Sequence, residues 1–285
     1  MAGVFGVDCR DARRARACEK DPARYDAAMR KRWIILLLLL TWLGGAAWWY
    51  RDALRPWIAQ LSGGVGLGVR QSLKPDPGKY AVLVSELARW RVDLANRHAG
   101  ARTDAERAVV ENDARVLLEQ VLPEMMRCWL GTPWDFNGTA SKPGGGRIAC
   151  GYYVATVLKD AGFQVDRYQL AQQPSGNILR SFLEKDDCTL VVGKPYDQYA
   201  SDISKAEPGI YLVGLDTHVA FLVHDGSAFK FVHSSGSRPW CVVEEERDEA
   251  HVLQRSNWRM TGNLTADPKV LRRWLKAEKI VVRGA

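Results

Sequence analysis

The sequence lacks the closely spaced metal ligands of common zinc proteins. Its 6 cysteines and 5 histidines form no Cys-x-x-Cys pair and no His-Glu-x-x-His motif, which are the spacings of structural and catalytic zinc sites. We therefore predict no metal ion and no cofactor. Internal repeats and low-complexity tracts are also lacking, which argues against a repeat architecture.

A basic stripe with interleaved aromatic residues, the pattern of proteins that bind single-stranded nucleic acid, is lacking too. The 40 lysine and arginine residues exceed the 33 acidic residues and give a net charge of +7. Much of this excess lies in residues 1–32, and basic and acidic residues are interspersed further along the chain. We expect no nucleic-acid partner, and we attribute the N-terminal charge to contact with anionic lipid.

The sequence does contain one long apolar run, WIILLLLLTWLGGAAWWY, from Trp33 to Tyr50, without a charged residue. At about 1.5 Å per residue, a helix of this length just spans a hydrocarbon core of about 30 Å, and the aromatic residues at its ends suit the membrane interface. A buried core helix and a cleaved signal peptide are the alternatives. The cluster Arg30-Lys31-Arg32 favours a cytoplasmic N-terminus, so we predict a single-pass membrane protein whose later residues are periplasmic or extracellular.

The rest of the chain is divided by its composition. We assign residues 1–32 to the cytoplasmic N-terminus, 33–50 to the transmembrane helix, 51–79 to a linker, 80–127 to a helical preface and 128–285 to the main domain. In the main domain, one helix followed by mostly short apolar strands predicts an α+β fold. The expected elements are a helix over 80–98, a helix that begins with the capping box of Thr103 and Glu106, a helix over 149–159, strands over 189–192, 210–214 and 241–243, and a helix over 269–276.

Three of the 5 histidines lie in the stretch THVAFLVHDGSAFKFVH. Two alternating apolar runs joined by Asp225-Gly226 predict a β-hairpin with a two-residue turn. This register would place His218 directly opposite His233 on one face of the sheet, with His224 on the same face. A histidine on a strand is most often a structural residue, but two paired imidazoles can orient each other's tautomers.

Cys150 is the cysteine whose position favours reactivity. It follows a Gly-rich loop and begins the expected helix in GGGRIACGYYVATVLKDAG, where unpaired N–H groups and the helix dipole favour a thiolate and can hold an oxyanion. Inert packing is the alternative for such a cysteine. Cys188 and Cys241 begin expected strands and could form a disulfide in an oxidising compartment, whereas Cys128 receives no role.

Two stretches, LGTPWDFNGTASKPGGGRIACGYYVATVLKDAGF and EPGIYLVGLDTHVAFLVHDGSAFKFVHSSGS, resemble the NlpC-type papain-like cysteine peptidase family. The first is similar to that family's Gly-Thr-Pro-aromatic loop and cysteine-bearing helix. The second is similar to its Gly-Asp-Leu-Val strand, its His-Val-Gly strand and the strand that ends in the third polar residue. The resemblance covers roughly residues 129–237 and implies a papain-like α+β core, in which the cysteine-bearing helix packs on an antiparallel sheet.

The resemblance implies that Cys150 is the nucleophile, His218 the general base and then acid, and His233 the residue that orients His218. We expect the Cys150 sulfur within hydrogen-bond reach of one His218 ring nitrogen and His233 at the other. The family's usual substrates are peptide bonds of bacterial peptidoglycan. The expected function is therefore that of a membrane-anchored cysteine hydrolase, which cleaves an amide bond in peptidoglycan stem peptides through a Cys-His-His triad.

The sequence departs from the family pattern around the nucleophile. Ala149 and Gly151 stand where the family usually has Asp and Ser, and Trp134 or Phe136 replaces a loop tyrosine that helps to form the family's oxyanion site. The substrate-binding and oxyanion candidates are Trp134, Phe136, Gly151 and Tyr152. Two alternatives stay open: an amidase of the same fold that acts on another acyl or protein amide, and a catalytically degenerate module that binds the cell wall.

Overall fold

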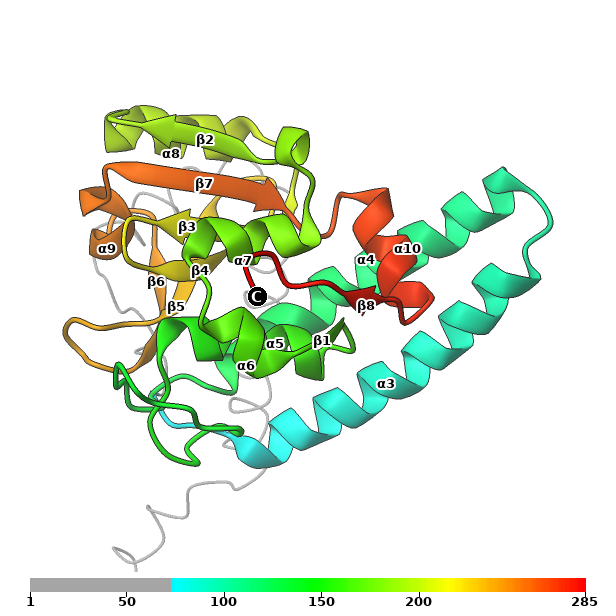
Figure 1. Cartoon of the computed structure of the whole chain (residues 1–285), viewed down its shortest axis with the longest axis horizontal. Helices are drawn as coiled ribbons and strands as arrows, with labels where there is room; N and C mark the ends of the chain where they lie inside the picture. The colour runs from blue at the N-terminus through cyan, green and yellow to red at the C-terminus, as the bar shows by residue number, and fades with distance from the viewer. Residues whose placement is uncertain (1–72) are drawn as a thin grey trace, which may run out of the picture. The chain divides into compact units, whose positions relative to one another are not determined.

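The structure is a computed structural model that describes residues 73–285. The expected cytoplasmic segment, the expected transmembrane helix and most of the expected linker lie outside the described residues. Within residues 73–285, no helix is both long enough and apolar enough to cross a bilayer. Helices and an antiparallel sheet make up this part of the chain, and the expected α+β class is confirmed at that level (Figure 1).

Two long helices begin the described chain, α3 (Pro77–Gly100) and α4 (Asp104–Arg127). The side chain of Asp76 caps α3. The expected capping box is present at α4, where Thr103 Oγ1 accepts from the Glu106 N–H at 3.1 Å and Glu106 Oε2 accepts from the Thr103 N–H at 3.1 Å. Because these side chains satisfy N–H groups that a helix start leaves unpaired, the local sequence fixes where both helices begin.

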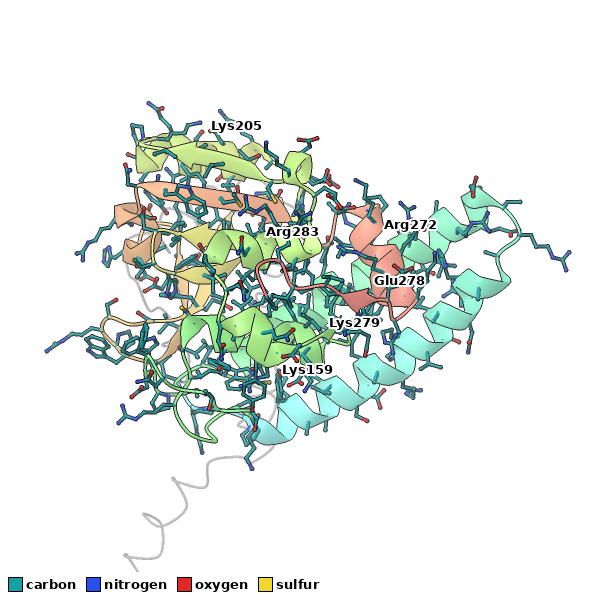
Figure 2. The ribbon with its side chains drawn as sticks, in the orientation of Figure 1. Lys159, Lys205, Arg272, Glu278, Lys279 and Arg283 are labelled. Carbon is teal, nitrogen blue, oxygen red and sulfur yellow. The ribbon has the colours of Figure 1, made fainter. Side chains whose placement is uncertain are left out.

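The hairpin of α3 and α4 shares its core with the domain that follows. Tyr80 of α3 meets the ring of Trp129 edge-on, with the ring centroids 5.6 Å apart. Helix α10 (Pro268–Leu275) packs against both helices. Arg272 lies on α10 (Figure 2) and forms an ion pair with Glu111 of α4 at 3.3 Å. The expected helical preface therefore packs as a continuation of the main domain.

The sheet has six antiparallel strands in the order β2-β7-β3-β4-β5-β6 (Figure 1). The strands are β2 (Thr189–Val192), β3 (Gly209–Leu215), β4 (Val219–His224), β5 (Phe229–Ser234), β6 (Val242–Glu246) and β7 (Trp258–Asn263). The sequence pattern predicts all of these strands except β7, which joins β2 to β3. Without β7, the edge strand β2 would have no partner in the sheet.

Alternate residues of the central strands are buried on opposite faces of the sheet. On one face, Phe221 packs with α5 (Cys150–Asp160). On the other face, Leu222 belongs to a second cluster with α8 (Tyr196–Lys205) and α9 (His251–Arg255). Fully burying a Phe or Leu side chain contributes about 1.5–3 kcal/mol, so both faces hold the sheet in place.

Short elements complete the fold between α5 and the sheet and at the C-terminus. They are β1 (Gln164–Val165), α6 (Arg167–Ala171), α7 (Ser175–Phe182), the 3-10 helix η2 (Lys185–Asp187) and β8 (Lys279–Ile280), which pairs in parallel with β1. The sequence analysis predicts none of these elements. Helices α6 and α7 nevertheless border the cysteine at the start of α5, as described below.

The register of the β4–β5 hairpin differs from the expected one. His224 pairs with Phe229, whereas a two-residue turn would pair His224 with Ser227. The shift is two residues, so His218 is diagonal to His233 and not directly opposite it. Because side chains alternate between the faces of a sheet, a shift of two still keeps both histidines on one face.

The hydrogen bonds of the Asp225 side chain explain the longer loop. Asp225 Oδ1 accepts from the N–H groups of Ser227 at 2.8 Å and Ala228 at 2.9 Å. The Asp225 N–H donates to the Ala228 carbonyl at 3.1 Å, which closes a four-residue loop. An aspartate that bonds to the backbone two residues later favours this turn over the tighter one.

Candidate active site

Cys150 is the first residue of α5, as the sequence predicts. Hydrogen bonds fix the loop that leads to it. The Ala149 N–H donates to the Gly138 carbonyl at 2.9 Å, and Ser234 Oγ on β5 donates to the Ile148 carbonyl at 2.7 Å. Ala149 supplies no side-chain cap, so the loop and the sheet, and not a capping residue, position the thiol.

Backbone N–H groups surround the sulfur, but the thiol is also buried. Burial raises the pKa of the Cys150 thiol above its ordinary value, and hydrogen bonds from the N–H groups of Val219, Gly151 and Cys150 itself oppose this shift. Because the net shift is upward, the resting cysteine is a thiol at neutral pH. The expected stabilisation of a thiolate by the N–H groups of the helix start is present, but burial outweighs it in the resting site.

The glycine after the nucleophile is required by close packing. A Cβ atom at Gly151 would lie 2.3 Å from the carbonyl oxygen of Ala171, the last residue of α6. A serine at this position, as in the resembled family, would collide with that backbone. The departure from the family pattern at Gly151 is thus explained by the position of α6.

His218 and His233 are held together in the structure. The residue His218 immediately precedes β4, and its Nε2 lies 2.8 Å from Nδ1 of His233 on β5. The other nitrogen of His233, Nε2, lies 3.2 Å from Oε2 of Glu245 on β6. His233 is fully buried. The three side chains form a continuous hydrogen-bonded row across neighbouring strands.

Both imidazoles are neutral at neutral pH. Burial, followed by the proximity of His233, lowers the pKa of His218 well below its ordinary value. Burial lowers the pKa of His233 to about 3. A neutral imidazole has one nitrogen that can accept a proton, so the neutral His218 is able to act as a base through whichever ring nitrogen carries no proton.

Cys150 and His218 face the same space without a direct hydrogen bond. Within the described residues, His218 is hydrogen-bonded through Nε2 to His233, and its Nδ1 has no partner. The expected contact of His233 with one ring nitrogen is therefore present, but the expected bond from Cys150 to the other nitrogen is not formed. Catalytic hydrogen bonds are often long before a substrate binds.

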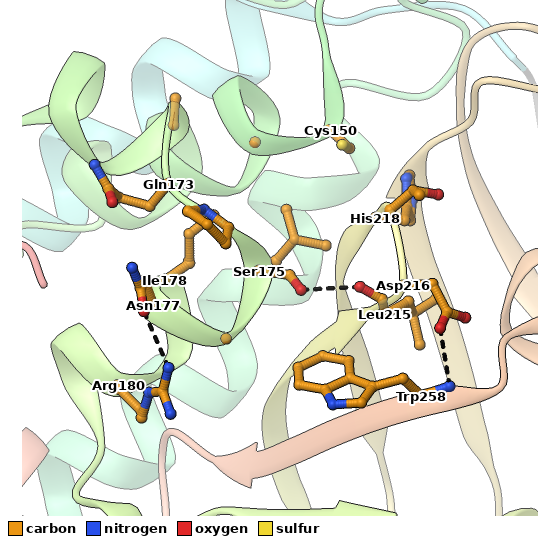
Figure 3. A pocket seen from close by; sticks show the side chains of 16 residues that line it. Cys150, Gln173, Ser175, Asn177, Ile178, Arg180, Leu215, Asp216, His218 and Trp258 are labelled. Carbon is orange, nitrogen blue, oxygen red and sulfur yellow. Dashed lines mark hydrogen bonds between the residues drawn. The ribbon is translucent and has the colours of Figure 1, made fainter. Parts of the chain in front are cut away.

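One pocket beside the thiol, of about 570 Å³, has a polar wall (Figure 3). Cys150 and His218 reach it from α5 and from the start of β4, and Arg180 lines its far side. Arg180 is hydrogen-bonded to Asn177 Oδ1 at 3.0 Å. Within the described residues Arg180 forms no ion pair with a carboxylate, although the Asp216 carboxylate lines the same pocket.

A second pocket, of about 790 Å³, has an aromatic wall and is also lined by Cys150 and His218. All four substrate-binding and oxyanion candidates line it: Trp134, Phe136, Gly151 and Tyr152. The thiol and the imidazole are thus part of the walls of both pockets.

The aromatic candidates offer a surface for contact with a ligand, but no obvious hydrogen-bond donor for an oxyanion. Trp134 lies against Trp240, with ring centroids 5.5 Å apart, and Phe136 is 78% exposed. The Tyr152 hydroxyl accepts a hydrogen bond from Gln172 Nε2 at 3.3 Å. The backbone N–H groups at the start of α5 are therefore the donors best placed for an oxyanion.

The remaining cysteines and His224 lie outside this arrangement. The four cysteines of the described residues are all free. Cys188 precedes β2 and Cys241 precedes β6, and these strands are opposite edges of the sheet, so the possible disulfide between them is excluded. His224 is buried, and both of its ring nitrogens lack a partner within residues 73–285.

Glu245 is a site residue that the sequence analysis misses. It lies in the acidic run EEERDE, which follows two valines. This pattern indicates the solvated end of an edge strand. Strands β5 and β6 pair His233 with Val243, so Glu245 is the diagonal neighbour of His233 on the same face. Only the register of β5 against β6 reveals this contact, and no local signal in the sequence supplies that register.

No family model, curated protein or solved structure matches this chain. We therefore infer its function from the residues and geometry of the site.

Proposed function

We propose that the protein is a membrane-anchored cysteine hydrolase of the NlpC type, with a papain-like core, that cleaves an amide bond in peptidoglycan stem peptides. One observation carries the proposal. Cys150 and His218 line the wall common to two pockets, and His233 lies 2.8 Å from the far nitrogen of His218. A nucleophile, a base and a residue that orients the base are the groups that acyl transfer requires.

The membrane part of the proposal rests on the sequence alone. The uncharged run from 33 to 50 and the basic residues before it favour a cytoplasmic N-terminus. The catalytic domain would then be periplasmic or extracellular, in the compartment that contains the cell wall.

In the proposed reaction, Nδ1 of His218 removes the proton from the Cys150 thiol as the sulfur attacks the substrate carbonyl. Proton removal and attack are coupled, because the resting pair is a neutral thiol and a neutral imidazole. The N–H groups of Cys150 and Gly151 hold the oxyanion. The imidazolium of His218 then protonates the leaving amine, and a water molecule that His218 deprotonates releases the acyl group from the sulfur.

The two pockets support a peptide substrate with charged groups. Arg180 offers a guanidinium without a carboxylate partner in the described residues, and guanidinium groups bind carboxylates with matched geometry. Stem peptides carry free carboxylates, so one end of such a peptide fits the polar pocket. The aromatic pocket would take the apolar or ring-bearing part on the other side of the scissile bond.

A cell-wall-binding module without turnover is the second candidate. It is favoured by one observation, the missing hydrogen bond between Cys150 and His218. Such a module would use both pockets for binding and would need neither the thiol nor the base.

The test is digestion of purified muropeptides by the full chain in detergent, followed by mass spectrometry of the products. We expect cleavage by the wild type and none by Cys150→Ala. Cys188→Ala is the matched control, because it removes another partly buried thiol that lines neither pocket. Binding of muropeptides without any cleavage by the wild type would favour the module over the enzyme.

A further inference from the structure

Glu245 completes a row of three hydrogen-bonded side chains that ends at His218, whose imidazole lines both pockets together with Cys150. Its Oε2 lies 3.2 Å from His233 Nε2, and His233 Nδ1 lies 2.8 Å from His218 Nε2. Within the described residues, His233 is the only side chain to which Glu245 is hydrogen-bonded. The mechanism above does not use this carboxylate.

We propose that Glu245 is a positioning residue which, when ionised, fixes the tautomers of His233 and His218 so that Nδ1 of His218 is free to accept the thiol proton. The inference rests on the proposed function only in assigning the base role to His218. It concerns how that base is prepared and not which substrate is cleaved.

The positions of the protons follow from donor and acceptor counts. A carboxylate can only accept, so it requires a proton on His233 Nε2, and a neutral imidazole with that proton has a bare Nδ1. His233 Nδ1 must then accept from His218 Nε2–H. This leaves His218 Nδ1 without a proton, which is the state that a base needs. An ionised Glu245 therefore permits only this arrangement.

A protonated Glu245 permits the reverse arrangement as well. Its hydroxyl can donate to His233 Nε2, which moves the His233 proton to Nδ1 and makes His218 Nε2 the acceptor. The His218 proton then lies on Nδ1, facing the thiol, and that imidazole cannot remove the thiol proton. No proton enters the two rings in this change, because each imidazole keeps one proton and only its position differs.

The titration of Glu245 falls near neutral pH. Burial raises the pKa of the Glu245 carboxyl to about 7, and the electrostatic interaction with His251 on α9 opposes this shift. Within the described residues, His233 of β5 and His251 of α9 are the titratable groups that face Glu245. We expect the fixed arrangement above about pH 7 and a mixture below it. The site would thus lose base strength as the pH falls through neutrality.

Nitrogen NMR of the histidine rings tests this directly, because it reports which ring nitrogen carries the proton without any substrate. The sample is the full chain in detergent, labelled with 15N at histidine, and His218→Gln and His233→Gln assign the signals. Near pH 8 we expect both rings to be protonated at Nε2. The tautomer with the proton on Nδ1 should appear below about pH 7. A proton that stays on His218 Nε2 at every pH from about 5 to 8 would overturn the inference.

Variants at β6 separate positioning from a structural role. Glu245→Gln keeps the shape but can both donate and accept, so it should remove the pH-dependent change of tautomer. Glu246→Gln is the matched control, because Glu246 is the next residue and forms its ion pair with Lys230. His251→Gln shows whether His251 affects the titration of Glu245. A Glu245→Gln protein with a wild-type tautomer transition would overturn the inference.

Iodoacetamide labelling of Cys150 gives a second readout. Near pH 8 we expect Glu245→Gln to react about tenfold more slowly than the wild type, since general-base assistance is partly lost. The ratio of the two rates should approach one below about pH 7, where the wild-type carboxylate is protonated. Equal rates at both pH values would contradict the inference.

These experiments also separate this inference from the proposed function. If the tautomers follow Glu245 but muropeptides remain uncut, the proposed substrate fails and the positioning role stands. If muropeptides are cut and the His218 tautomer is independent of pH, the positioning role fails alone.

Discussion

Nε2 of His218 lies 2.8 Å from Nδ1 of His233, although the two residues are diagonal and not opposed across the β4–β5 hairpin. The two rings are nearly perpendicular, with an interplanar angle of 87°. Diagonal neighbours on one face are roughly 7–8 Å apart at the backbone, so both side chains must lean toward each other to make this bond. The contact therefore sets the direction in which Nδ1 of His218 points.

Substitution of His233 tests whether this contact orients the base. His233→Ala should lower kcat/KM by about 100-fold, which is a typical contribution of a positioned general base. His233→Gln should retain more activity, because its side-chain oxygen can accept from His218 Nε2–H. If both variants lose activity equally, while circular dichroism shows that both are folded, then the hydrogen bond from His218 to residue 233 does not orient the base.

The reactivity of the cysteines tests the role of His218. Near neutral pH, iodoacetamide should label Cys150 faster than Cys128, because Cys128 is buried and burial raises its pKa to about 11. His218→Ala should slow the labelling of Cys150 and leave that of Cys128 unchanged. The rates can be followed by peptide mass spectrometry. If His218→Ala leaves the Cys150 rate unchanged, the imidazole does not assist the thiol.

The sequence singles out Cys150, His218 and His233 as candidates, and the structure brings His218 to His233 and places Cys150 and His218 on the same pockets, but the sequence does not predict the hydrogen-bonded row that includes Glu245. Cys150 has a local signal, because a Gly-rich loop leads into a helix. The two histidines share a face of the sheet because side chains alternate along a strand, as the sequence pattern predicts, even though the loop is two residues longer than expected. Glu245 has no local signal, because its contact depends on the pairing of β5 with β6.

In the fold, too, the sequence predicts an element that local interactions define and misses one that depends on distant contacts. The capping box of Thr103 and Glu106 predicts the start of α4 correctly, because capping is a local interaction. Strand β7 is not predicted, since three polar residues, Arg259, Thr261 and Asn263, interrupt its apolar pattern. Arg259 is buried, and it donates hydrogen bonds to the carbonyl oxygens of Leu253 at 3.0 Å and Lys194 at 2.9 Å. Lys194 comes from a distant part of the chain, so the sequence alone does not reveal this partner.

Gly151 should tolerate no side chain. Gly151→Ala places a Cβ 2.3 Å from the carbonyl oxygen of Ala171, and overpacking of this kind typically costs about 1–3 kcal/mol of unfolding free energy. Gly100→Ala is the matched control, because a Cβ there meets nothing within 4 Å. Denaturant unfolding of both variants measures the difference. Equal stability of the two variants would mean that α6 is free to move away from the helix start.

The stability of the protein should depend on pH through His233 and Glu245 with opposite signs. His233 has a folded pKa of about 3, below its ordinary value of 6.5, so the unfolded chain binds more protons between these values. The free energy of unfolding should therefore fall as the pH falls from 6.5 toward 3. Glu245 has a folded pKa of about 7, above its ordinary value of 4.5. Its contribution to the free energy of unfolding therefore falls as the pH rises from 4.5 to 7.

Two variants separate these contributions. His233→Gln should reduce the loss of stability at acid pH, by at most about 1.4 kcal/mol per pH unit for one proton. Glu245→Gln should remove the loss between pH 4.5 and 7. Denaturant unfolding at a series of pH values gives both curves. Curves parallel to that of the wild type would contradict the burial of these two groups.

The central claim is that Cys150 forms a covalent acyl intermediate, and mass spectrometry of the acid-quenched protein tests it most directly. The full chain is mixed with a muropeptide, quenched within the first turnover, and digested to locate any added mass. We predict an addition equal to the acyl half of the substrate on the peptide that contains Cys150, and none in Cys150→Ala. Cleavage that continues in Cys150→Ala, or a wild type that neither cleaves nor carries an adduct, would contradict the account.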